Sequence, residues 1–590
     1  MNIQWFGLVF CLSGPLISQS VLQPVIVTAT RLSISSADLR EVEIISRREI
    51  EELAEGSVVS LFRHMGTVDL QRRNTGGAAD FSLRGASFEQ VLVLIDGVRI
   101  NNPQTGHHNS EIPVALSDIE RIEVLSGTAS SLYGSEAFGG VIQIITRNDL
   151  STGTDLSFRG GSFGTVDLGI SHRWKTGPVH HRGSLEQARS DGYRSDTDYQ
   201  NWLLSYQMRW HRDDWTLSAR AGGQFKDFGA GGFYADYPSR EKTSSWNAAV
   251  ELRGNRGKKP PWVFRWHGRR HHDDFILDKN DPEWFRTNHS TTIWGGEWQS
   301  EFRTLWGRAV LGTDVLGENL QSTQLGNRHR SRAALYGETE MVPASAIRVN
   351  SGIRWDWNDS WGHQFNPTLN MRFGSASLYG RLSAGRAFRA PTFTELYYQS
   401  PANQGDPDLQ PECAWSFETG TGYQIRGLHA EAALFYRRET NKIDWIRSDA
   451  SMPWQVTNSG LIHVRGISAG IRGSLNTRWN LAVHYIFLDR LENSPIDAQS
   501  KYGAGIWRHH LTCRGNLVWS KRIQQNWLIQ GKSRQKQAVN WILDTRIIFR
   551  LNSSLRFYME LNNCLDVIIE EIPGVPMPGR SLMSGVTFGR

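Results

Sequence analysis

The sequence contains little cysteine and no long apolar run. Four cysteines occur among 590 residues: Cys11 lies in an N-terminal apolar stretch, and Cys413, Cys513 and Cys564 are far apart. Such an odd, widely spaced set predicts neither a disulfide framework nor a zinc site. The negative mean hydropathy excludes a bundle of membrane-spanning helices. Lys and Arg, which give a net charge of +6, are dispersed rather than grouped, so a nucleic-acid surface is not expected.

The apolar stretch without charge, Trp5–Ile17, is short for a membrane-spanning helix. It is followed by Ser18-Gln19-Ser20, which supplies the small residues of a cleavage site. We therefore interpret residues 1–20 as a cleaved secretory signal, although no Lys or Arg precedes its apolar part. Lipid attachment through Cys11 is the weaker alternative, because the bulky Phe10 precedes the cysteine.

Residues 21–36 hold a short segment that favours a lone strand. Pro24 favours an extended entry, and four of the five residues in Val25–Ala29 are β-branched. Polar residues follow the segment. From the residues alone two interpretations stay open: an edge strand of the next domain, or a strand that adds to the sheet of a partner.

Residues 37–148 have the pattern of a small α/β domain. Ser46 and Glu49 have capping-box spacing before an amphipathic run, and a second short helix, Val58–Met65, stops at Gly66. Asp96-Gly97 predicts a tight hairpin turn. The polar loop Pro103–Asn109 is not expected to pack in a core. Short strands are predicted at Val68–Gln71, Phe81–Arg84, Val91–Ile95, Val98–Ile100, Ile119–Leu125 and Val141–Ile145.

Residues 149–590 alternate apolar and polar side chains. Trp202, Leu204 and Tyr206, for example, share one face, and Leu203 between them is an exception. A period of two over hundreds of residues predicts a transmembrane β-barrel, with lipid outside and a wet lumen. The sheet must close because open edges cannot exist in lipid. At about 20 residues per strand, this region gives about 22 antiparallel strands. So wide a lumen would be an open hole unless filled, and the preceding α/β domain is the obvious filler.

Several motifs resemble those of TonB-dependent outer-membrane receptors, over nearly the whole chain. VIVTATR at Val25–Arg31 looks like the TonB box, which moves the interpretation of that strand towards partner binding. The chain departs from the family pattern at Ser126-Gly127-Thr128, where RGP is usual, and at Gly589-Arg590, which follow the last aromatic residue. The other matching motifs are LRG (Leu83–Gly85), VLVLIDGVRINNPQTGHHN (Val91–Asn109), DIERIEVLSG (Asp118–Gly127), SLYGSEAFGGVIQIIT (Ser131–Thr146), AGRAFRAPTFTELY (Ala384–Tyr397), GDPDLQPE (Gly405–Glu412) and GVPMPGRSLMSGVTF (Gly574–Phe588).

The resemblance implies a bacterial outer-membrane protein in which an α/β plug fills the barrel. Such a receptor takes up a scarce small ligand with energy from TonB and its inner-membrane energising complex. TonB would bind Val25, Ile26, Val27, Thr28 and Ala29. The resemblance further implies a monomer surrounded by lipid and lipopolysaccharide, with no enzyme activity, resident cofactor or nucleic acid.

The pattern is most similar to that of cobalamin-receptor-like members of the family. PQTGHHN (Pro103–Asn109) and FGAGGFYADYPSRE (Phe228–Glu241) carry this likeness. A corrinoid is therefore the first expected ligand and an iron chelate the second. A passive porin and a binding-only surface receptor are the alternatives.

Polar plug loops and an aromatic barrel loop are the expected ligand contacts. Polar groups on a firmly held loop are common binding elements. The alternatives are a merely solvated loop for the polar groups and membrane anchoring for the aromatic ones. The candidates are Asp80, Ser87, Gln104, Thr105, His107, His108, Asn109, Phe233 and Tyr234.

The sequence shows no metal-ligand spacing, and we expect no metal site. Neighbouring strand residues point to opposite faces, so a pair such as His271-His272 cannot share one ion. Asp191, Asp196 and Asp198 could bind Ca²⁺, as the likeness to cobalamin receptors suggests, but Asp often simply caps turns. Gly160–Gly164 matches G-x-S-x-G, yet it lacks the following helix that a nucleophile elbow needs.

Overall fold

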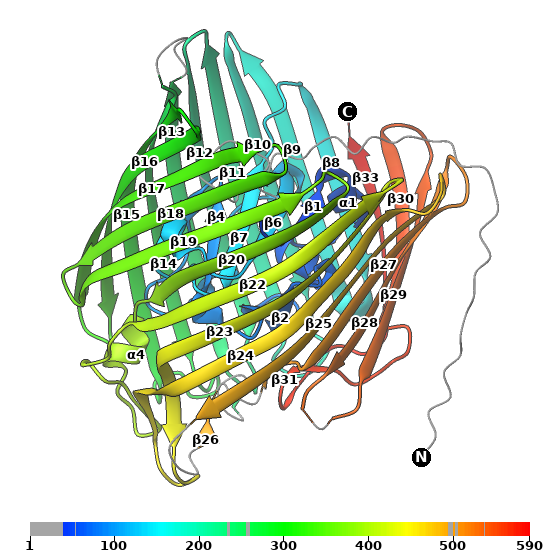
Figure 1. Cartoon of the computed structure of the whole chain (residues 1–590). Coiled ribbons are helices and arrows are strands. Elements are labelled where there is room, and N and C mark those ends of the chain that lie inside the picture. The colour runs from blue at the N-terminus through cyan, green and yellow to red at the C-terminus, as the bar shows by residue number, and fades with distance from the viewer. Residues whose placement is uncertain are drawn as a thin grey trace, which may run out of the picture.

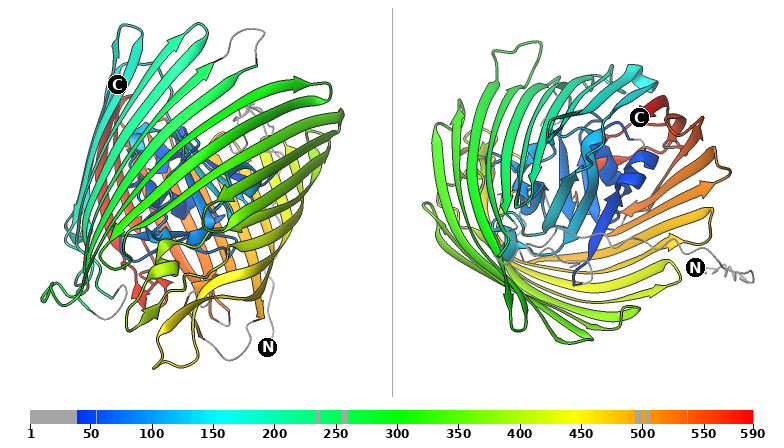
Figure 2. Two further views of the ribbon diagram at one scale, coloured as in Figure 1. Left: turned by 90° about the vertical axis from the view of Figure 1, so that its left-hand side faces the viewer. Right: turned by 90° about the horizontal axis from the view of Figure 1, so that it is seen from above.

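The computed structural model describes residues 39–53, 55–232, 237–254, 260–493, 499–501, 505–535 and 537–589. Within these ranges the chain forms a closed β-barrel with a small α/β domain, the plug, inside it (Figure 1; Figure 2, right). No helix in the described part of the chain is long and apolar enough to span a membrane. The expected signal, the expected TonB box at Val25–Ala29, and the candidate contacts Phe233 and Tyr234 lie outside the described residues.

The plug contains a five-stranded sheet of order β1-β6-β7-β4-β5, in which only β4 and β7 run parallel. Strands β2 and β3 form a separate sheet. The six predicted strands and both predicted helices are confirmed, and β1 is an addition that the pattern does not predict. The elements are β1 (Val42–Ser46), α1 (Arg47–Leu53), α2 (Val58–Leu61), η2 (Phe62–His64), β2 (Val68–Arg72), β3 (Ala79–Leu83), η3 (Phe88–Gln90), β4 (Val91–Ile95), β5 (Val98–Arg99), η4 (Gly106–His108), η5 (Leu116–Asp118), β6 (Ile119–Ser126), α3 (Ser130–Tyr133) and β7 (Gly140–Thr146).

Strands β4 and β7 lie in the middle of the plug and are buried along their whole length. Val93 and Ile142 belong to the larger apolar cluster. Leu92 and Val141 belong to a second cluster, formed by the alternate residues of the same strands. A strand covered on both faces has no polar side, which explains the near-continuous apolar sequence of both strands.

The predicted turn at Asp96-Gly97 joins β4 to β5. Both residues have positive φ, 51° and 80°, as a type I′ hairpin turn requires. The Asp96 carboxylate also accepts hydrogen bonds from the backbone N–H and the hydroxyl of Thr146, both at 2.9 Å. These bonds fix the turn to the end of β7.

Among the described residues the barrel has 22 antiparallel strands, which confirms the number estimated from the sequence. It closes where β33 pairs with β8. The strands are β8 (Gly153–Gly161), β9 (Thr165–Thr176), β10 (Val179–Ser190), β11 (Tyr199–Arg212), β12 (Trp215–Gly229), β13 (Arg240–Gly254), β14 (Trp262–Ile276), β15 (Arg286–Thr304), β16 (Gly307–Ser322), β17 (Arg328–Ala344), β18 (Ile347–Asn358), β19 (Gly362–Gly374), β20 (Leu378–Arg389), β22 (Glu412–Ile425), β23 (Leu428–Arg447), β24 (Trp454–Ser474), β25 (Trp479–Asn493), β27 (His509–Val518), β28 (Ile523–Ser533), β29 (Asn540–Arg550), β30 (Leu555–Asn562) and β33 (Ser581–Gly589). The loops and turns contain η6 (Ser162–Gly164), α4 (Phe393–Tyr397), β21 (Asn403–Gln404), β26 (Gln499–Ser500), β31 (Glu570–Ile572) and β32 (Val575–Pro576).

The barrel strands turn apolar side chains outward and polar ones inward. On β30, Phe557 and Met559 are 43% and 52% exposed, whereas Tyr558 and Glu560 between them are 8% and 2% exposed. Leu203, the exception to the alternation, is buried. The wall that faces the plug is therefore largely polar, as expected for a barrel with lipid outside.

The two ends of the barrel differ in their connections. At one end neighbouring strands are joined by tight turns, such as Gly177-Pro178 between β9 and β10. At the other end the loops are longer, and the loop between β20 and β22 contains α4 (Figure 1). In outer-membrane barrels the short turns are periplasmic and the long loops extracellular, which orients the molecule.

The lipid-facing residues of β17 lead to a prediction of how much a charged side chain destabilises the barrel at two depths in the membrane. Leu335, near the middle of the strand, is 55% exposed. We expect Leu335→Arg to lower the free energy of unfolding by about 2–4 kcal/mol, because it places a cation near the middle of the hydrocarbon layer.

The matched control is Val342→Arg, on the same strand close to its short turn, where Val342 is 50% exposed. Here the cost should be about 0–1 kcal/mol. Both values can be measured by denaturant titration in lipid vesicles. Equal losses at the two positions would contradict the depth assigned to Leu335.

Candidate functional site

The candidate site lies where the plug loops meet the barrel wall near the extracellular end. The loop Pro103–Asn109 is almost wholly buried there, and Gln104, His108 and Asn109 are each at most 4% exposed. The loop joins none of the apolar clusters of the described residues, as expected, but the sequence gives no sign that it is buried at all. It is buried because the lumen wall is itself polar and supplies partners, as when the Arg269 guanidinium donates to the His108 carbonyl at 3.3 Å.

His107 is held by three plug residues. Its ring stacks on Phe88 with 4.2 Å between ring centroids, and its Nδ1 lies 2.8 Å from Asp80 Oδ1. Arg73 lies 3.4 Å from the same carboxylate. Burial lowers the pKa of His107 to about 4 despite the neighbouring Asp80. The imidazole is therefore neutral at physiological pH, and the candidates Asp80 and His107 form one structural unit.

His108, unlike His107, is positively charged. Its Nε2 lies 3.5 Å from Asp273 Oδ2, and its Nδ1 lies 3.9 Å from Glu111 Oε1. Burial would lower the pKa of His108, but Asp273, Glu111 and Glu241 outweigh that effect and raise it to about 9. An imidazolium therefore sits among carboxylates that come from the plug and from the barrel.

The extracellular loop with α4 covers the plug loop. The Phe393 N–H donates to the Pro103 carbonyl at 2.9 Å, and the Thr394 N–H donates to the Gln104 carbonyl at 3.1 Å. A capping box formed by Thr392 and Glu395 begins α4. The helix therefore presents its first backbone N–H groups to the plug.

Arg389 holds the α4 loop in place through two ion pairs. Its buried guanidinium lies 2.8 Å from Glu395 and 2.7 Å from Glu412. Glu412 also accepts a hydrogen bond from Gln90 of the plug at 2.8 Å. These residues lie in the motifs at Ala384–Tyr397 and Gly405–Glu412, but no residue type or spacing within the motifs assigns them this holding role.

The predicted ligand contacts fall into three groups. Ser87 and Thr105 are half-buried at the loop tips, and Glu89 between the two loops accepts the Gly106 N–H at 2.9 Å. The candidates that the structure buries are Asp80, Gln104, His107, His108 and Asn109. Phe233 and Tyr234 lie outside the described residues.

Two of the three aspartates considered for Ca²⁺ lie near basic side chains. Asp196 pairs with Lys279, and Asp198 lies 3.0 Å from Arg240. Within the described residues, the groupings of side chains close enough to share an ion do not include Asp191, Asp196 and Asp198 together. The G-x-S-x-G match spans the end of β8 and the turn η6 that leads into the antiparallel strand β9, which agrees with its expected lack of the nucleophile-elbow context.

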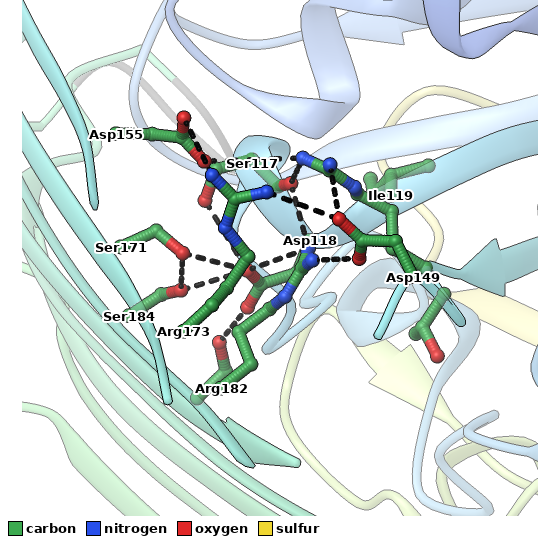
Figure 3. A network of polar contacts seen from close by, with 12 residues as sticks. Ser117, Asp118, Ile119, Asp149, Asp155, Ser171, Arg173, Arg182 and Ser184 are labelled. Carbon is green, nitrogen blue, oxygen red and sulfur yellow. Dashed lines mark hydrogen bonds and ion pairs between the residues drawn. The ribbon is translucent and has the colours of Figure 1, made fainter. Parts of the chain in front are cut away.

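A polar anchor holds the plug on the periplasmic side of this site (Figure 3). The buried Asp118 carboxylate accepts hydrogen bonds from the hydroxyls of Ser184 and Ser171, at 2.7 and 3.3 Å. Nearby, Asp149 pairs with Arg182 and lies 3.0 Å from Arg173. Plug and barrel therefore meet through charged and hydroxyl groups here as well.

A second anchor lies at the start of β1. The buried Glu41 carboxylate lies 2.6 Å from Arg84, 3.3 Å from Arg381 and 3.2 Å from His484. Burial would raise the pKa of Glu41, but these partners hold it well below its usual range. The preceding residue, Arg40, donates to the carbonyls of Ser126 and Thr128, so it supports the turn at which the chain departs from the RGP pattern.

Comparison with known families decides what this arrangement is. Residues 37–141 match the TonB-dependent receptor plug domain, and residues 138–564 match the TonB-dependent receptor-like β-barrel. The chain belongs to the TonB-dependent receptor family. It is therefore an outer-membrane transport receptor rather than an enzyme.

Relatives of this receptor include two vitamin B12 transporters. Vitamin B12 transporter BtuB of Photobacterium profundum is 25% identical over 463 residues, which cover 75% of this chain and 74% of the relative. The protein of the same name from Vibrio cholerae serotype O1 is 27% identical over 464 residues, 72% and 71% of the two chains.

Two solved structures show the same fold. The siderophore receptor PirA from Pseudomonas aeruginosa has a TM-score of 0.76 at 18% identity and covers 93% of this chain and 99% of its own. The copper transporter OprC has a TM-score of 0.82 at 15% identity and covers 94% and 100%.

The contacts of Glu41 lead us to expect that removal of its carboxylate weakens the attachment of β1 to its surroundings. Glu41→Ala leaves Arg84 and Arg381 buried without this carboxylate, and breaking a buried pair costs about 3–5 kcal/mol. We expect the amides of β1 to exchange with solvent faster by roughly two to four orders of magnitude. Hydrogen exchange with mass spectrometry measures this directly.

Arg48→Ala is the control, because the Arg48 side chain is 75% exposed and its pair with Glu52 lies on the surface. Such pairs contribute about 0–1 kcal/mol, so exchange in β1 should change little. Equal protection of β1 in the wild type and in Glu41→Ala would show that Glu41 does not anchor the strand.

Proposed function

We propose that this receptor takes up a corrinoid of the cobalamin type across the outer membrane, with energy delivered through TonB. The supporting structural observation is the gated lumen, in which a plug fills a closed barrel and is held by polar contacts at Glu41, Asp118 and the α4 cover. An iron chelate is the second ligand class. We further propose a monomer in contact with lipid and lipopolysaccharide through its exposed apolar band.

The volume of the cavity beside the plug supports the view that the plug must move before a ligand can pass. A cavity of about 430 Å³ lies between the plug and strands β9–β15 at the periplasmic end, and its lining includes Arg173, Arg182 and Arg220. This volume is near the lower bound for a drug-sized ligand, about 300–1,000 Å³. A bulky ligand such as a corrinoid therefore needs rearrangement of the plug before it can pass, and that rearrangement requires work.

The proposed handle for that work is the strand Val25–Ala29. Backbone pairing with an added strand gives a grip that resists pulling without a deep pocket. The pull would reach Arg40 and Glu41 first, because they are the first polar anchors that follow the handle along the described chain.

A single substitution separates binding from uptake. Val27→Pro removes a backbone donor from the proposed pairing, so we expect ligand still to bind while cobalamin-dependent growth is lost. Ser33→Pro, which lies after the handle, should leave uptake near the wild-type rate. Full uptake by Val27→Pro would refute the handle.

Ligand class can be tested on the purified receptor in detergent. Titration calorimetry should show saturable binding of cyanocobalamin, weakened at least about 10-fold by Thr105→Trp, because a large ring there would obstruct the loop tip. Arg48→Trp, on the distant helix α1, should bind normally.

The competing ligands and functions give different results. Saturable binding of a ferric chelate without binding of cyanocobalamin would shift the assignment to the second ligand class. Deletion of residues 21–150 with unchanged native flux would indicate a porin. Binding without accumulation, whether or not TonB is present, would indicate a surface receptor only.

A further inference from the structure

We propose that His108, Glu241 and Asp273 form a binding site for a divalent transition-metal ion between the plug and the barrel wall. The three residues come from η4, β13 and β14 respectively. All three are buried, and one potential ligand atom from each lies within 4.8 Å of the others. The site does not include the aspartates considered for Ca²⁺. It shares His108 with the expected ligand contacts but takes a metal ion rather than a corrinoid, so it goes beyond the proposed function.

Strand register brings the two carboxylates together. Thr243 lies opposite Asp273 in the β13–β14 ladder, and Glu241 lies two residues before Thr243 on the same face. Glu241 and Asp273 are therefore diagonal neighbours on the inner wall, within reach of each other. His108 of the plug loop adds an imidazole from the opposite side, with its Nε2 3.5 Å from Asp273 Oδ2.

In each of the two carboxylates, one buried oxygen atom lacks a hydrogen-bond donor among the described residues. Glu241 Oε2 and Asp273 Oδ1 are buried and make no hydrogen bond with any residue in the described ranges. A buried acceptor without a partner is costly. Around an ion with bonds of about 2.0–2.2 Å, ligand atoms in a tetrahedral arrangement lie roughly 3.5 Å apart, so modest closure of the three side chains would complete the coordination.

The surroundings of His108 suit a metal ligand. Its other ring nitrogen, Nδ1, faces Glu111 Oε1 at 3.9 Å. Glu111 is held in turn by the Thr243 hydroxyl and lies 2.9 Å from His271 Nε2. A metal-bound histidine usually directs its second N–H to a carboxylate, which fixes the ring and makes it a better ligand.

The charges around the site are mixed, and it is the set of donor atoms that favours a transition-metal dication. Three carboxylates, Glu111, Glu241 and Asp273, lie close together, and Lys226, Arg73, Arg269, His271 and His289 are the basic groups around them. An ion at His108 Nε2 would take the place of the proton on that nitrogen. One imidazole with two carboxylates selects Zn²⁺, Fe²⁺ or a similar metal over Mg²⁺ or Ca²⁺, which prefer oxygen ligands only.

Such an ion would join the plug loop directly to the barrel. His108 belongs to the loop that α4 covers, whereas Glu241 and Asp273 are fixed in the wall. Bound metal would therefore restrain the loop that carries Thr105 and His107. The expectation of no metal site from the sequence overlooks this possibility, because the three ligands are separated by up to 165 residues and meet only through strand register.

The test uses the full-length receptor in detergent, stripped with chelator and titrated with ZnCl₂ alone. We expect saturable binding of one Zn²⁺ per chain by calorimetry and by elemental analysis after desalting. Glu241→Gln and Asp273→Asn keep the shape of each side chain, and each should weaken binding at least 10-fold. Co²⁺ in place of Zn²⁺ should give visible absorption bands that the same variants lose.

His272→Ala is the matched control, because His272 follows His271 on β14 but lies on the other face of the strand. It should bind Zn²⁺ as the wild type does. Absence of binding by the folded wild type, or equal binding by the wild type, Glu241→Gln and Asp273→Asn, would overturn the proposal and leave a charge cluster only. Neither TonB nor a corrinoid enters the measurement, so this result is independent of the uptake experiments.

Discussion

The polar inner wall of the barrel is the constraint on which the rest of the structure depends. A strand that faces lipid on one side presents its other set of side chains to the lumen. The plug must therefore meet that wall with polar and charged groups, and each buried charge needs a partner. Glu41, Asp118 and Arg389 meet this need at three separate places in the lumen.

A polar interface is well suited to a plug that has to move. The attraction within a buried ion pair is largely offset by the loss of hydration, so water that enters the interface can replace much of what is broken. The apolar core of the plug behaves differently, because exposing it costs about 25 cal/mol per Å². Strands β4 and β7, buried along their whole length, therefore remain together under loads that already separate the plug from the wall.

Local patterns predicted much of this fold. The period of two gave the barrel, chain length gave about 22 strands, and Asp96-Gly97 gave the plug hairpin. Strand β1 was missed because Val42–Ser46 is short and contains Glu43. The burial of Pro103–Asn109 against the barrel wall does not follow from the pattern, because a polar loop normally faces water. The α4 cover and the His108 cluster could not be predicted, since their members lie far apart in sequence and only strand register brings them together.

The position of β1 explains how a pull from the N-terminus can act in steps. It is an edge strand with a single neighbour, β6, and its register pairs Val42 with Leu125 through Ser46 with Arg121. Edge pairing is the easiest part of a sheet to open, because only one side of the strand is hydrogen-bonded. Under the proposed load, release of Glu41 would free β1 first, while β6, β7 and β4 still hold the apex loop through Asn101, whose amide donates to the Val91 carbonyl at 2.8 Å. The loop Pro103–Asn109 would therefore keep its shape until the edge strand has gone, so that under the proposed function ligand binding would precede passage.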